Sequence, residues 1–175
     1  MSVAHVVLLG PMGAGKTTLG RALAKELEVD LVDSDEVLLA LTDQSAAELA
    51  ATLGVPGLHD LERSLVSAAL ESSSRKVIAA AASVVDDEAT RHLLSKHLCL
   101  WVEADWTTLA ERRELGSHRR HISSEEAQDL DRVRRMSVAD FLIGKVDTST
   151  ATVQQCVAAA MTIVSRHLLS QEDSL

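Results

Sequence analysis

The segment Gly-Pro-Met-Gly-Ala-Gly-Lys-Thr at residues 10–17 constrains the fold more than any other part of this chain. It fits the pattern G-x-x-x-x-G-K-[ST], in which glycines let backbone N–H groups wrap around an anion. The preceding residues, Val3–Leu9, form a mostly apolar run typical of a buried strand. The following residues, Thr17–Leu27, repeat apolar side chains at helical spacing. A strand, a glycine-rich loop and a helix in this order predict a phosphate-binding loop with a helix N-terminus directed at the phosphate.

Composition limits the class of protein. A chain of 175 residues suits one domain, which we expect to span residues 1–175, and 46% apolar with 25% charged residues is typical of a soluble globular fold. No apolar stretch is long enough for a membrane span, and no basic leader precedes the first strand. Cys99 and Cys156 lack disulfide or metal spacing and are interpreted as reduced core residues. These features predict a cytoplasmic protein without a membrane partner, and we expect a monomer.

The charge distribution points to a small anion as the ligand. A net charge of −9 argues against general affinity for nucleic acids. Yet 7 of the 17 lysines and arginines lie between residues 112 and 135. Such a cluster is either a solvated helix face paired with local acids or a set of anion ligands, and the phosphate loop favours the second interpretation. The cluster comprises Arg112, Arg113, Arg119, Arg120, Arg132, Arg134 and Arg135.

Strand-like and helical segments alternate along the whole chain. Because each parallel crossover needs a helix, this alternation predicts an α/β fold with a five-stranded parallel sheet between two layers of helices. The predicted strands are Val3–Leu9, Val29–Val32, Lys76–Ala81, His97–Glu103 and Phe141–Val146. The predicted helices lie at about 17–28, 34–53 in two pieces, 59–73, 87–95, 105–115, 124–137 and 150–169. A polar, basic segment at Gly116–Ile122 indicates a mobile loop.

Two acidic residues follow the second predicted strand, in the sequence Leu31-Val-Asp-Ser-Asp35. Ligands of parallel sheets collect beyond the carboxyl ends of the strands, where the phosphate loop also lies. One of the two carboxylates could hold the water shell of a metal while the other contacts a substrate hydroxyl. The structural alternative is helix capping by Ser34 or Asp35.

With these two motifs the sequence resembles the shikimate kinase family of phosphate-loop kinases, and the resemblance is collinear to about residue 165. It implies a three-layer kinase fold with a lid loop, here at about 112–123, and a helical substrate-binding region, here at about 34–62. It also implies transfer of the γ-phosphoryl group of ATP to a hydroxyl of shikimate. The matching segments are Gly10–Thr17 with the helix after it, Val32–Asp35, Val77–Val85, Trp101–Asp105, Arg119–Arg120 and Val146–Thr148.

The resemblance also implies roles for individual residues. It makes Thr17 and Asp33 the Mg²⁺ ligands, the latter through water, and Lys16, Asp35 and Arg120 the catalytic residues. Asp35 contacts the acceptor hydroxyl, and Arg120 is the lid arginine that closes over the transferring phosphate. The implied ATP or ADP contacts are Gly13, Ala14, Gly15, Lys16, Thr17 and Thr18, with Arg113 against adenine.

The implied acceptor site departs from the family pattern. His59 stands where the family has an arginine that grips the shikimate carboxylate, and Ala81-Ala82-Ser83 replaces three glycines. A histidine lacks the planar guanidinium fork, and the added Cβ atoms narrow the pocket. A second carboxylate-binding arginine corresponds to Arg134 in one alignment and falls between Asp131 and Arg132 in another. The implied acceptor contacts are Asp35, His59, Glu62, Ala81, Ala82, Ser83 and Arg134.

Three functions therefore remain open at this point. The default is an ATP-dependent shikimate kinase, and the departures at His59 and at 81–83 argue against it. The second is a kinase of the same mechanism with another small hydroxyl compound as acceptor. The third is a nucleotide-binding regulatory protein without catalysis, against which the complete set Lys16, Asp35 and Arg120 argues.

Overall fold

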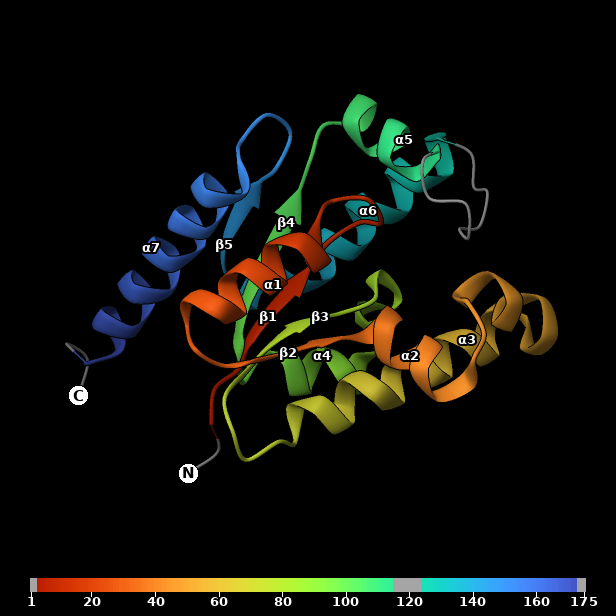
Figure 1. Ribbon diagram of the computed structural model, residues 1–175, viewed down its shortest axis with the longest axis horizontal. Helices are drawn as coiled ribbons and strands as arrows, with labels where there is room; N and C mark the ends of the chain where they lie inside the picture. Colours follow the sequence, from red (N-terminus) through yellow and green to blue (C-terminus); the bar gives the residue numbers. More distant parts are fainter. Residues whose placement is uncertain (1–2, 115–123, 173–175) are drawn as a thin grey trace.

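A five-stranded, entirely parallel sheet forms the centre of the computed structural model, which describes residues 3–114 and 124–172 (Figure 1). The strand order is β2-β3-β1-β4-β5. The predicted fold class is confirmed. The strands are β1 (Val6–Leu9), β2 (Asp30–Asp33), β3 (Lys76–Ala79), β4 (Leu98–Glu103) and β5 (Leu142–Asp147).

Helices connect every pair of consecutive strands, as parallel pairing requires. The α-helices are α1 (Lys16–Glu26), α2 (Ser34–Thr42), α3 (Ala46–Leu70), α4 (Glu88–Leu94), α5 (Trp106–Glu114), α6 (Ser124–Val138) and α7 (Val153–Glu172). Two short 3₁₀ segments are η1 (Ala82–Asp86) and η2 (Ala139–Phe141). In the described ranges no helix is both long enough and apolar enough to cross a membrane.

Strand β1 occupies the middle of the sheet because all four of its side chains are apolar and buried. It pairs with β3 through Val6 and Val77, and with β4 through Val6 and Leu98. A strand covered on both faces reads as a continuous apolar run rather than an alternating one. The sequence pattern before the phosphate loop has this form, and it fixes the loop at the carboxyl end of the central strand.

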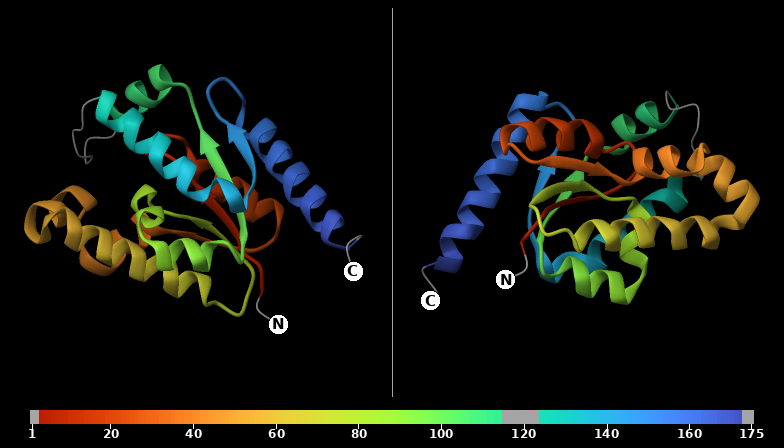
Figure 2. Two further views of the ribbon diagram at one scale, coloured as in Figure 1. Left: turned by 180° about the vertical axis from the view of Figure 1, so that it is seen from behind. Right: turned by 60° about the horizontal axis from the view of Figure 1, so that its bottom comes forward.

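Two hydrophobic clusters cover the two faces of the sheet. On one face, Leu19 and Leu23 of α1 pack with Ala160 and Val164 of α7. On the other face, side chains from α3, α4, α6 and η1 pack together, and the view from behind in Figure 2 shows α4 and α6 on that side. A third, smaller cluster joins α2 to the first half of α3, which project beyond the sheet in Figure 1.

The region after β2 follows the predicted helices closely, with a difference at one boundary. The two helical pieces predicted over 34–53 correspond to α2 and the first part of α3, and the predicted break follows at Gly54, whose backbone is not helical (φ 73°, ψ 166°). The helix after the break begins before the predicted residue 59 and ends at Leu70 rather than at 73. A capping box starts α3: the Ser45 hydroxyl accepts from the Glu48 N–H, and the Glu48 carboxylate accepts from the Ser45 N–H. The S-x-x-E signal was present in the sequence, so this boundary was predictable.

Candidate active site

The phosphate loop joins β1 to α1 and depends on glycine at three positions. Gly10 has φ 140°, and Gly13 and Gly15 both have φ 88°, values that residues other than glycine rarely adopt. A Cβ atom on Gly10 would lie 2.0 Å from the Val102 carbonyl oxygen of β4. The loop can therefore rest directly on the backbone of the neighbouring strand only without a side chain at Gly10.

The Lys16 ammonium is directed back over this loop. Its Nζ donates to the carbonyl oxygens of Gly10 at 2.9 Å and Pro11 at 3.0 Å. Lys16 is also the first residue of α1, and no side chain caps that helix at Gly15. The uncapped N–H groups and the ammonium thus bring partial and full positive charge to the same place, which suits a phosphate group.

Asp33 lies at the end of β2 and connects three parts of the site. Its Oδ2 accepts a hydrogen bond of 2.6 Å from the Thr17 hydroxyl, while its Oδ1 accepts from the N–H groups of Asp35 and Glu36. Asp33 is therefore the N-cap of α2, in place of the Ser34 or Asp35 cap considered from the sequence. The side chain is buried, and this capping fixes its orientation toward Thr17.

Asp35 is exposed in the first turn of α2 and faces the same cavity as the loop. The cavity has a volume of about 210 Å³ and contains the two acids, the loop and the end of β3. It is lined by Met12, Gly13, Gly15, Lys16, Thr17, Thr18, Asp33, Ser34, Asp35, Ala79, Ala80 and Arg112. The phosphate loop and the Asp33–Asp35 segment, which α1 and β2 separate in the sequence, therefore meet at one edge of the sheet.

Glu62 marks the acceptor side of the predicted site. It is buried on α3 and accepts a hydrogen bond from the Ser83 hydroxyl of η1. Burial raises the pKa of the Glu62 carboxyl above its usual value, against the Ser83 hydrogen bond, which lowers it. The nearby charge of Asp35 also raises this pKa, and those of Arg134 and Lys16 lower it. Glu62 therefore lies within the electrostatic reach of the phosphate loop.

Arg134 lies on α6 and is held by Asp86 at the end of η1. Its Nε donates to Asp86 Oδ1 at 2.8 Å, and its Nη2 donates to Asp86 Oδ2 at 2.5 Å. Only 13% of the Arg134 side chain is exposed. Sequence alignment left two positions open for the second carboxylate-binding arginine. Of these, Arg134 lies close enough to Glu62 for its charge to lower the pKa of that carboxyl.

Comparison with known proteins now decides the family. The family model described as shikimate kinase matches residues 12–164, most of the chain. The chain belongs to the shikimate kinase family. The shikimate kinase of Corynebacterium efficiens is 35% identical over 160 residues, covering 87% of this chain and 92% of that protein. The shikimate kinase of Corynebacterium glutamicum is 32% identical over 161 residues, covering 89% and 94%.

A solved structure shares the fold of this shikimate kinase family member. The shikimate kinase from Acinetobacter baumannii in complex with shikimate aligns with a TM-score of 0.86 and 19% identity, covering 95% of each chain. At this identity the likeness concerns the fold. The sheet and its covering helices thus form an architecture that the two proteins share.

Arg112 belongs to the arginine cluster interpreted from the sequence as anion ligands, but its place at the phosphate loop was not predicted. Its Nη1 donates to the Gly13 carbonyl at 3.2 Å and to the Thr148 hydroxyl at 2.9 Å, and its Nη2 donates to the Thr148 carbonyl at 2.8 Å. The side chain therefore bridges α5, the phosphate loop and the segment after β5. Arg113, which we expected near adenine, is the last but one residue of α5, and its side chain lies outside the described part of the chain, as does all of Arg120.

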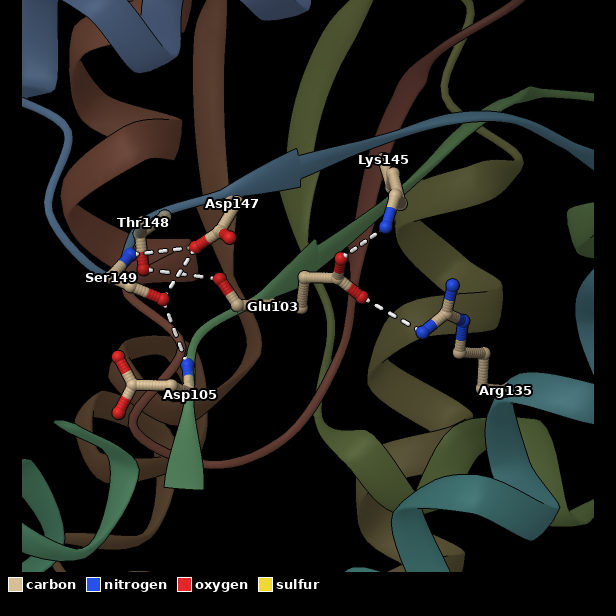
Figure 3. A network of polar contacts seen from close by, with 7 residues as sticks. All are labelled: Glu103, Asp105, Arg135, Lys145, Asp147, Thr148 and Ser149. Atoms are coloured by element: carbon tan, nitrogen blue, oxygen red, sulfur yellow. Dashed lines mark hydrogen bonds and ion pairs between the residues drawn. The ribbon is translucent and has the colours of Figure 1, made fainter. Parts of the chain in front are cut away.

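A polar network positions Thr148 for this bridge (Figure 3). The Thr148 N–H donates to the Glu103 carbonyl at 2.9 Å, and its hydroxyl donates to the Ala14 carbonyl at 2.8 Å. Next to it, the Ser149 hydroxyl accepts from the Asp105 N–H and donates to Asp147. The ends of β4 and β5 are thus tied to each other and to the phosphate loop.

The remaining predicted acceptor residues lie around Glu62. His59 is half-buried on α3, one turn before Glu62 and on the same side of the helix. Ala82 and Ser83 open η1, whereas Ala81 packs into the core cluster with Trp101 and Val138. Strand β3 ends at Ala79, two residues earlier than predicted, so Ala79 and Ala80 line the loop cavity instead.

Proposed function

We propose that this protein transfers the γ-phosphoryl group of ATP to a hydroxyl group of shikimate. The observation that carries the proposal is the convergence of Lys16, the Thr17–Asp33 pair and Asp35 on one cavity, in a chain of the shikimate kinase family. Phosphoryl transfer requires positioned charges more than covalent catalysis, and this cavity supplies them.

The phosphate loop is the proposed nucleotide site. Backbone N–H groups from Gly13 to Thr18 surround the phosphates, and Lys16 neutralises charge that develops on the transferring group. Arg112 holds the loop against Thr148 and so keeps these N–H groups in place. Arg113 is proposed to lie against adenine, and Arg120 to close over the transferring phosphate; both roles rest on the family pattern.

Thr17 and Asp33 are the proposed Mg²⁺ ligands. Both present hard oxygen atoms, and the two side chains already meet at 2.6 Å, so the donor set fits this ion. When bound, Mg²⁺ would neutralise phosphate charge. In the described ranges, no group of three or more His, Cys, Asp or Glu side chains could hold a metal by itself. The remaining ligands would therefore be phosphate oxygens and water, as is usual at kinase sites.

Asp35 is the proposed catalytic contact to the acceptor hydroxyl. It stands in the first turn of α2, exposed to the cavity, where it can accept the proton that the hydroxyl loses. The proposed acceptor region is the helical segment 34–62 together with η1 and α6. Its proposed contacts are His59, Glu62, Ala81, Ala82, Ser83 and Arg134.

The proposal extends to the whole protein. We infer one kinase domain over 1–175 with a lid at about 112–123, most of which lies outside the described residues. We also infer a monomer in the cytoplasm. The net charge of −9 favours small-molecule rather than nucleic-acid partners.

The test is a phosphoryl-transfer assay with purified protein, Mg²⁺, ATP and shikimate. The expected result is one ADP and one phosphorylated shikimate formed per turnover, with the product identified by mass. Asp35→Asn should remove this activity while ADP binding is retained. ATP consumption that requires a different hydroxyl compound, or no consumption with any acceptor of a panel, would overturn the proposal.

A further inference from the structure

The pair Arg134–Asp86 is unlike the other arginine pairs of α6. Two guanidinium nitrogens donate to two carboxylate oxygens at 2.8 and 2.5 Å, which is the bidentate fork that arginine forms with carboxylate ligands. Arg132 and Arg135 instead donate single bonds of 2.9 Å to Asp129 and Glu103. Their side chains are 72% and 47% exposed, against 13% for Arg134.

The fork lies on the acceptor side of the site. Asp86 is the last residue of η1, and Ser83 of the same segment donates its hydroxyl hydrogen bond to Glu62. The charges of Arg134, Asp35 and Lys16 all act on the Glu62 carboxylate. Arg134 is therefore within the electrostatic reach of the proposed acceptor contact, and its Nε–Nη2 edge is already occupied by Asp86.

An acceptor carboxylate has two routes to this guanidinium. It can take the Nε–Nη2 edge by displacing Asp86, or it can bind Nη1 and the second Nη2 hydrogen and then lie close to the negative charge of Asp86. Both routes reduce the net gain from binding a carboxylate. A neutral acceptor with the same hydroxyl groups does not pay this penalty.

We propose that Asp86 is a specificity-determining residue that competes with the acceptor carboxylate for Arg134. This inference rests on the proposed function, because it takes the surroundings of Glu62 and Arg134 as the acceptor site. The substrate feature that this site disfavours is a carboxylate. The cause is Asp86, which is not one of the proposed catalytic residues.

The experiment compares wild type with Asp86→Asn, using shikimate and shikimate methyl ester as acceptors. We expect Asp86→Asn to lower KM for shikimate by roughly three- to tenfold with kcat nearly unchanged, since the grip is remote from the phosphoryl group. The ester, which has no carboxylate charge, should show no such gain. In an Arg134→Gln background the Asp86→Asn change should have no effect on shikimate.

Asp129→Asn is the matched control, because it removes one carboxylate from an exposed arginine pair on α6. An equal gain with this control would show a general charge effect and overturn the inference. An unchanged or higher KM in Asp86→Asn, with ADP affinity and thermal midpoint retained, would show that Asp86 positions Arg134 instead, and would also overturn it.

Shikimate binding is measured in parallel by calorimetry in the presence of ADP. Tighter binding in Asp86→Asn without turnover in any variant would overturn the proposed function and support the role of Asp86. Turnover of shikimate with an unchanged shikimate affinity in Asp86→Asn would support the proposed function and overturn the role of Asp86. Absence of both shikimate binding and turnover in every variant would overturn both.

Discussion

The nucleotide end and the acceptor end of this site satisfy their charges differently. At the nucleotide end, Lys16 donates to neutral carbonyl oxygens, and Arg112 donates to carbonyls and a hydroxyl. These contacts place both cations at the phosphate loop. At the acceptor end, Arg134 is already paired with a carboxylate and Glu62 with a hydroxyl. The two ends should therefore respond differently to substitution.

The difference suggests where this sequence has diverged within its family. Lys16 and Arg112 contact neutral oxygens of the phosphate loop, where a phosphate ligand would add a strong counter-charge. A cation compensated by an internal acid depends less on the ligand. Substitutions at the nucleotide end should thus remove function, whereas substitutions at the acceptor end should change affinity and can even increase it.

The largest effect is expected for Lys16→Ala. Removal of the ammonium leaves the terminal phosphates without their main protein counter-charge, and we expect kcat/KM to fall on the order of a thousandfold. Steady-state kinetics and a calorimetric ADP titration measure the loss, and Lys25→Ala on the exposed side of α1 is the control. Equal nucleotide affinity in wild type and Lys16→Ala would contradict the assignment of the loop.

Arg112→Ala should have the next largest effect, on the nucleotide alone. Three hydrogen bonds between α5, the loop and Thr148 are lost, so we expect nucleotide affinity to fall roughly tenfold to a hundredfold. Separate titrations with ADP and with shikimate measure the effect of the substitution on each end of the site. Arg132→Ala, at an exposed arginine, serves as control. If shikimate KM rose as much as the nucleotide Kd, the two ends would not be independent.

Arg112 and Asp86 show which parts of the site could not be predicted from the sequence. The phosphate loop and the sheet were predictable because glycine spacing and continuous apolar runs are local signals. The contact of Arg112 with the phosphate loop was not predictable, since adjacent helical residues point about 100° apart and only the packing of α5 against Thr148 brings this arginine to the loop. Asp86 gave no signal either, because its partner is 48 residues away in the sequence.

His59→Arg tests the acceptor end by adding a cation. The new guanidinium would stand one turn from the buried Glu62, on the side where a shikimate carboxylate is expected. We expect KM for shikimate to fall roughly threefold to thirtyfold while kcat changes little, because this grip acts equally on ground and transition states. Acceptor-saturation kinetics decide this.

The control for that change is His92→Arg, which adds the same charge at an exposed position of α4. A KM that does not move in His59→Arg would mean that another cation already holds the carboxylate. The comparison between the two ends would then have to be revised, since the acceptor end would be complete as it stands.

The smallest effect on catalysis is expected for two buried histidines, which test the stability of the sheet that carries both ends of the site. The rings of His5 and His97 stack with centroids 4.9 Å apart at the amino ends of β1 and β4, opposite the site. Each Nδ1 accepts a backbone N–H, from Lys76 and from His5 respectively. Protonation of either Nδ1 would remove an acceptor, so the folded protein favours the neutral rings.

Burial, followed by the charges of His5 and Lys96, lowers the pKa of His97 from 6.5 to about 4, and burial also lowers the pKa of His5. The unfolded chain therefore takes up protons at a higher pH than the folded protein. Stability should be fully present above about pH 6.5 and fall as the pH drops toward 4. Thermal midpoints at pH 7.5, 6 and 5 measure this, and His97→Asn should show a smaller fall. A midpoint that is constant over this range would refute the prediction.

The contact between Thr148 and Ala14 also affects how the protein is made. The two residues are 134 positions apart, and the Thr148 hydroxyl donates to the Ala14 carbonyl oxygen in the phosphate loop. The phosphate loop leaves the ribosome early, but its supporting partner follows only after almost the whole chain has been synthesised. Nucleotide therefore cannot stabilise a partly synthesised chain through the finished site, and its stabilising effect begins only after β5 has joined the sheet.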